Sequence, residues 1–102
     1  MNELYEILKQ LNIPVAYHHF VQETNPPFIT YYRSDTNNFY ADNKVYEKIN
    51  NYRVELYTRQ KDISLETQLE AILDDNEITY EVETETYIKE EDVYQVIYNI
   101  NI

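Results

Sequence analysis

Two adjacent histidines, His18 and His19, are the residues in this sequence best suited to metal binding or proton transfer. Histidine is a frequent metal ligand and a frequent general base, so a pair could carry either chemistry. The surrounding segment, residues 14–20, is predicted to be a strand, in which neighbouring side chains point to opposite faces of the sheet. Metal sites also use several ligands at regular spacings, and no such set accompanies this pair. We therefore expect one inward and one outward histidine, and no metal ion.

Nucleophilic catalysis has equally little support in the sequence. There is no cysteine, which excludes a disulfide framework, an iron–sulfur site and a thiol nucleophile. The two serines, Ser34 and Ser64, lie outside any Gly-x-Ser-x-Gly turn. Glycine is also absent, so the phosphate-cradling loops of nucleotide-binding proteins are excluded. Carboxylates are plentiful, but two of them act as acid and base only in a cleft that separates their pKa values. We expect neither an enzyme nor a cofactor.

The carboxylates dominate the charge of the chain, since nineteen Asp and Glu outweigh eight Lys and Arg to give −11. This balance argues against nucleic acid as a preferred partner, because such binding relies on Lys and Arg neutralising phosphates. Glu81, Glu83 and Glu85 alternate along a predicted strand and are expected to share one face, about 7 Å apart. They form either a solvent face whose charge blocks edge-to-edge pairing or an acidic surface that lines a passage or meets a basic partner.

Tyrosine is the positive signal in the composition, with twelve copies in 102 residues. A domain of this size has a thin core that does not hold all of them. Tyrosine is enriched at protein–protein interfaces, because its ring offers a large contact area and its hydroxyl a polar tip. Any single tyrosine is better explained as a half-exposed sheet residue, but the set predicts an interaction surface. Its candidate members are Tyr40, Tyr46, Tyr57, Tyr87 and some of Tyr94 and Tyr98.

The elements that position these residues are predicted from hydrophobic periodicity within a single domain, residues 1–102. Leucine and isoleucine recur at helical spacing over residues 4–11 and again over 65–73, where Asp62 or Ser64 is the expected N-cap. Strand patterns cover residues 14–20, 28–32, 52–58, 78–88 and 94–102, and the last two form a C-terminal hairpin. The predicted fold is α+β: two helices packed on a mostly antiparallel sheet with a C-terminal β-hairpin. No apolar run is long enough to span a membrane, and we expect no membrane partner.

One segment, residues 33–44, has no periodicity and is expected to be a loop. It is polar but carries Phe39 and Tyr40 in its middle. Structureless loops of about 12 residues are uncommon in small domains and are usually functional or disordered.

Several stretches of the sequence together resemble the tail-terminator, or tail-completion, proteins of long-tailed phages and prophages of Gram-positive bacteria. The resemblance covers nearly the whole chain, and the following stretches carry it. They are residues 27–32 (PFITYY), 38–46 (NFYADNKVY), 51–58 (NYRVELYT), Lys61 with Asp62, the leucine pattern of 65–73, and the tyrosine-rich C-terminal hairpin.

The resemblance implies an α+β subunit of a hexameric ring at the head-proximal end of the tail tube, in the virion, assembled in the host cytoplasm. Such a ring stops tube polymerisation, contacts the major tail tube protein and the head connector, and lets DNA pass without specific binding. An acidic subunit suits that role by repelling phosphates. Two hypotheses follow. Residues 33–44 contact the neighbouring subunit or the tube, with the interface candidates Phe39, Tyr40, Asp42, Lys44, Tyr46 and Tyr57. The second is that Glu81, Glu83 and Glu85 face the ring lumen.

Two other functions remain open. One is a head-closure or neck connector protein from the same part of the virion. The other is an acidic inhibitor that mimics DNA, which requires carboxylates spaced like phosphates over one broad surface.

Overall fold

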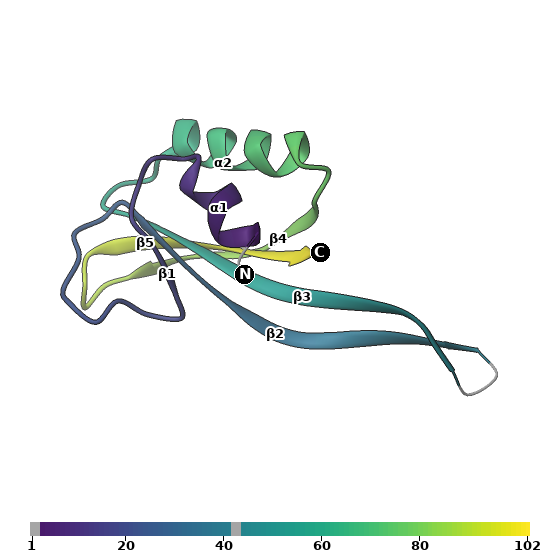
Figure 1. Ribbon diagram of the computed structural model, residues 1–102. Helices are drawn as coiled ribbons and strands as arrows, with labels where there is room; N and C mark the ends of the chain where they lie inside the picture. Colours follow the sequence, from purple (N-terminus) through teal and green to yellow (C-terminus); the bar gives the residue numbers. More distant parts are fainter. Residues whose placement is uncertain (1–2, 42–43) are drawn as a thin grey trace.

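Figure 1 shows the computed structural model of the protein, which describes the backbone of residues 3–41 and 44–102 and the side chains of that part outside 35–49. Two helices lie on one face of a five-stranded sheet of order β1-β2-β3-β5-β4. Neighbouring strands are antiparallel, except that β1 runs parallel to β2. The predicted α+β class, with a mostly antiparallel sheet and a C-terminal strand pair, is confirmed. The elements are α1 (Glu3–Lys9), β1 (Val15–Tyr17), β2 (Phe28–Ala41), β3 (Lys44–Thr58), α2 (Ile63–Asp75), β4 (Thr79–Ile88) and β5 (Val93–Asn101).

Both helices form where the apolar spacing predicts them. In α1 the buried side chains are Leu4, Ile7 and Leu8, which occupy one stripe of the helix. The N-cap of α2 is Asp62, whose carboxylate accepts a hydrogen bond from the backbone N–H of Leu65 at 3.0 Å. That bond satisfies one of the amides that the first helical turn leaves without a partner.

The core lies between the two helices and the sheet face beneath them. On the strands, the members of this core alternate along the sequence, as Ile29 and Tyr31 or Val54 and Leu56 do, so that one face of the sheet meets the helices. In the centre, each fully buried aliphatic side chain contributes about 1.5–3 kcal/mol to the free energy of unfolding, relative to an exposed one. The fully buried members are Leu8, Ile29, Tyr31, Val54, Leu56, Leu69, Leu73, Tyr98 and Ile100.

The expected loop at residues 33–44 is wrong, because β2 and β3 continue as a paired hairpin from Asp35↔Asn51 to Ala41↔Lys44. Strand β5, the other neighbour of β3, does not follow this hairpin. It pairs with β3 only as far as Asn51, and Ile102 extends the pairing to Asn50. We call residues 35–41 and 44–49 the arm. It projects beyond the sheet and bends toward the side away from the helices (Figure 1). The whole molecule accordingly measures 50 × 27 × 25 Å. The sequence of the arm has no apolar alternation, so periodicity does not predict it as a strand pair.

Candidate interaction surface

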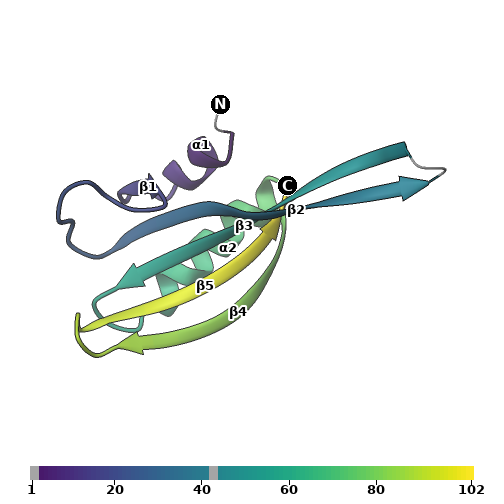
Figure 2. The same cartoon turned by 90° about the horizontal axis from the view of Figure 1, so that it is seen from below.

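The second face of the sheet carries no helix (Figure 2). Register places alternate residues of three strands on this open face, where directly paired residues share a side. They are Phe28, Thr30 and Tyr32 on β2, Arg53, Glu55 and Tyr57 on β3, and Gln95, Ile97 and Asn99 on β5.

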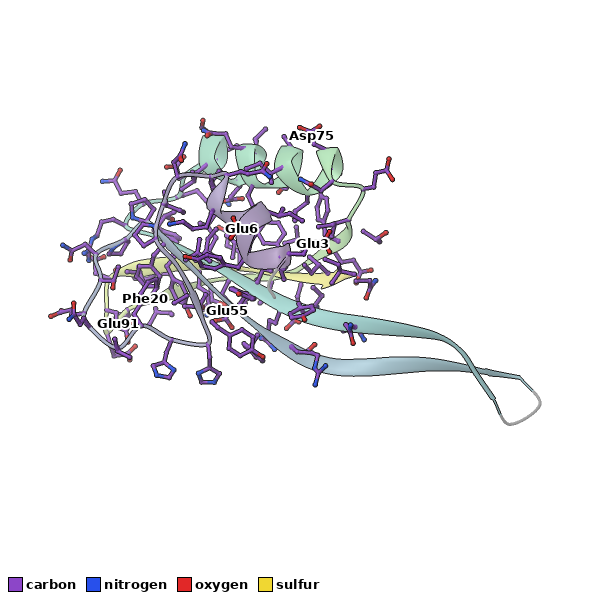
Figure 3. All side chains as sticks on the ribbon, viewed as in Figure 1. Glu3, Glu6, Phe20, Glu55, Asp75 and Glu91 are labelled. Atoms are coloured by element: carbon purple, nitrogen blue, oxygen red, sulfur yellow. The ribbon has the colours of Figure 1, made fainter. Side chains whose placement is uncertain are left out.

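Aromatic rings gather at one end of the open face. Phe28 and Tyr57 face each other across β2 and β3, with ring centroids 4.8 Å apart in a stacked arrangement. The chain after β1 folds under the sheet and brings Phe20 edge-on to Phe28 at 5.2 Å. Figure 3 shows Phe20 on the side of the sheet away from the helices, together with Glu55 and Glu91. Such contacts fix ring positions and contribute about 0.5–1.5 kcal/mol each beyond area burial.

Beside these rings, Glu55 is the centre of a hydrogen-bond network. Its Oε1 accepts from the Thr30 hydroxyl at 3.0 Å and from the Tyr57 hydroxyl at 3.1 Å. Gln95 Nε2 donates to the same Tyr57 oxygen at 2.8 Å. Burial, and then the Glu55 charge, raise the pKa of Tyr57 above its ordinary value. The network holds the Tyr57 ring in one orientation.

Arg53 links Glu55 to β4. Its Nε lies 3.4 Å from Glu55 Oε2, a contact between opposite charges without hydrogen-bond geometry, since this buried Nε has no hydrogen-bond partner among the described atoms. Its Nη2 donates to Glu83 Oε2 at 3.3 Å, and Asn99 Nδ2 donates to Glu83 Oε1 at 2.7 Å. The open face is thus cross-linked by polar contacts over four strands.

The prediction that Glu81, Glu83 and Glu85 share a face is wrong. The register shifts between Val82 and Thr84, so an extra residue on β4 reverses the alternation. Glu81 pairs with Asn99 on the open face, whereas Glu85 pairs with Val96, which packs in the core under the helices.

Glu85 instead takes part in a bridge to helix α2. Lys61 Nζ lies 2.7 Å from Glu85 Oε1 and 2.7 Å from Glu66 Oε2. Hydrogen bonds to Glu66 and then Glu85 raise the pKa of Lys61. The carboxylates of β4 therefore do not form one acidic ridge.

The histidine prediction is also wrong in its geometry. Strand β1 ends at Tyr17, and His18 has a φ of 72°, which turns the chain out of the extended conformation. The rings of His18 and His19 lie together, with their Nδ1 atoms 3.0 Å apart. Across residues 3–41 and 44–102, no three His, Cys, Asp or Glu side chains are grouped to hold a metal ion.

The predicted interface residues divide into two places. Phe39, Tyr40, Lys44 and Tyr46 belong to the arm, and their side chains lie outside the described ones, as does the whole of Asp42. Tyr57 lies at the opposite end of β3, on the open face. The sequence prediction missed Phe20 and Phe28 as part of this face. The available signal was the aromatic residue on each side of the Asn25-Pro26-Pro27 break.

Comparison with known protein families and with curated proteins found no match. In the part of the chain that the structure describes, neither helix has the length and apolar character needed to cross a membrane.

Proposed function

We propose that the chain is a tail-terminator subunit of a long-tailed phage or prophage. In this proposal it forms a hexameric ring on the head-proximal end of the tail tube, stops tube growth and provides the surface on which the head connector docks. The sequence resemblance motivates the proposal, and the α+β fold agrees with what that resemblance implies.

The observation that best supports an assembly role is the arm. Among the described residues, this two-stranded ribbon has no third strand beside it, and an isolated hairpin is only marginally stable in water. The edges of a two-stranded ribbon also invite pairing with other chains. A segment of this kind is best explained by contact with a second molecule. For tail termination, that molecule is a neighbouring subunit or the tube.

The test is a double substitution, Phe39→Ala with Tyr40→Ala, in a phage that carries this gene. We expect a folded protein whose tails lose their defined length, because large aromatic side chains are the usual anchors of an interface. Electron microscopy of the tails measures the effect. The matched control is Ile63→Ala, an exposed large apolar residue on helix α2 in the body of the protein, which should leave tail length unchanged. Normal tail lengths and normal head joining in the double variant would refute the interface assignment.

The two alternatives predict different phenotypes. Loss of a head-closure protein leaves tails of normal length and heads that leak DNA. A DNA mimic stays monomeric or dimeric in native mass spectrometry and binds a nuclease or polymerase. The mimic has less support from the structure, because the carboxylates of β4 are divided between two faces.

A further inference from the structure

A cavity of about 410 Å³ opens on the open face at the end of the sheet where β2 and β5 begin. Its walls include the rings of Phe20, Phe28 and Tyr57, with Glu91 at the margin. A second cavity of about 510 Å³ shares Thr24, Phe28 and Glu91 with the first. Each is far larger than the ~30 Å³ that one water occupies. In the first cavity the rings of His18 and His19 add to those of Phe20, Phe28 and Tyr57, and Thr24, Thr30 and Glu91 supply polar groups. Walls of this kind suit an aromatic side chain as occupant.

The arm leaves the body at the opposite end of the sheet. It starts next to the Asn51↔Asn101 pair, where β5 finishes, whereas the cavity lies beside the Phe28↔Tyr57 pair. Figures 1 and 2 show the arm pointing away from that end. An arm cannot therefore fill the cavity of its own chain. It also bends toward the side of the molecule on which the cavity opens (Figure 1).

The length of the arm suits contact with a second copy. About seven residues per strand, at ~3.3 Å each, give a reach of about 23 Å. That is close to the shorter dimensions of the molecule, 27 and 25 Å. An arm that starts at the end of one copy thus reaches well under the open face of a copy placed beyond that end.

The charge distribution also favours the arm as the part that approaches another copy. Residues 35–49 hold two lysines and three carboxylates, so they carry only −1 of the chain's −11. Two acidic bodies repel each other at close range, and a nearly neutral ribbon approaches such a body at a lower electrostatic cost.

We infer that the arm of one copy binds the cavity end of the open face of the next copy, joining copies head to tail. A projecting segment at one end and its receptor at the other form a heterologous interface, which closes into a ring when the rotation between copies allows it. The inference rests on the ring in the proposed function and names the contact that builds it.

Disulfide cross-linking tests the contact, because the chain has no cysteine of its own. A protein with Asn38→Cys in the arm is mixed with one carrying Thr24→Cys, a residue that lines both cavities. The control partner carries Gln68→Cys on exposed helix α2, on the other side of the sheet. We expect at least tenfold more mixed disulfide dimer with Thr24→Cys than with Gln68→Cys. Equal yields, or a protein that stays monomeric and forms no cross-link, would overturn the inference.

A second variant measures association without cysteine. Thr24→Trp places a large ring in the cavities, and we expect self-association to weaken by roughly tenfold or more, the effect of blocking one interface anchor. Sedimentation gives the association constant, and circular dichroism shows that the fold is kept. Unchanged association in the folded variant would contradict the contact.

The outcomes separate this contact from the proposed function. If the protein controls tail length but gives no preferential cross-link, the arm contact is refuted and the proposed function stands. If the arm cross-links to the cavity, but removal of the protein leaves tail length unchanged, the contact stands and the tail-terminator assignment is refuted.

Discussion

Glu55 illustrates how single residues shape the open face. Its side chain is only 14% exposed, so its charge is largely withdrawn from water and needs donors or a cation close by. Thr30 and Tyr57 supply the donors and Arg53 the cation. The order of the Tyr57 ring, and with it one wall of the cavity, therefore depends on a carboxylate on the same strand.

Tyr98 gives a prediction about pH. Its hydroxyl donates to Glu70 Oε2 at 3.0 Å, and burial, followed by that bond, strongly raises its pKa. An unfolded tyrosine loses its proton near pH 10, while folded Tyr98 keeps it. The unfolded state then binds fewer protons, so Tyr98 lowers the free energy of unfolding as pH rises above about 10. Below that pH its contribution is fully present.

Tyr98→Phe should remove this effect. We expect a loss of about 1 kcal/mol at pH 7, from the missing hydrogen bond. Above pH 10 the free energy of unfolding should fall less steeply than in the unmodified protein, by up to about 1.4 kcal/mol per pH unit for one proton. Urea unfolding from pH 7 to 11.5 measures both. Parallel curves over that range would show that Tyr98 titrates alike in both states.

At the scale of the elements, the N-cap of helix α2 gives a prediction about stability. The sequence left Asp62 and Ser64 as candidates, and only Asp62 accepts from the backbone of the first turn. We expect Asp62→Ala to lower the free energy of unfolding by about 1 kcal/mol, because the Leu65 amide loses its acceptor. Thermal and urea denaturation measure the change.

Ser64→Ala is the matched control. The Ser64 hydroxyl accepts only a long side-chain hydrogen bond, from Gln68 Nε2 at 3.3 Å. Its removal should change stability by less than about 0.5 kcal/mol, as for an ordinary surface position. If both variants lose equal stability, the cap assignment fails.

At the scale of the whole molecule, the arm and the body should be separable. The buried core residues that the structure describes lie outside residues 32–53. Replacing residues 37–49 by Asn-Gly, a two-residue turn that suits a hairpin, should change the free energy of unfolding by less than about 1 kcal/mol. The same variant should lose self-association. Circular dichroism and sedimentation give the two readings, and an unfolded product would show that the arm stabilises its own body.

The sequence by itself determined the helices, most of the strands and the α+β class. One face of each of these elements is buried, so its apolar residues recur with the period of the element. Leu4 and Leu8 follow the helical period of 3.6, and Val54 and Leu56 the strand period of 2. The net charge and the absence of cysteine and glycine are also properties of the sequence and do not depend on the fold.

Only the tertiary structure decided the features without such a pattern. The arm has no apolar alternation in its sequence, so it is seen only in the strand pairing of β2 with β3. One extra residue on β4 separates Glu85 from Glu81, and a left-handed φ at His18 brings two histidine rings together. The cavity unites Phe20, Phe28 and Tyr57 from segments distant in sequence. Each depends on register or chain reversal, which are properties of the folded chain rather than of local residue type.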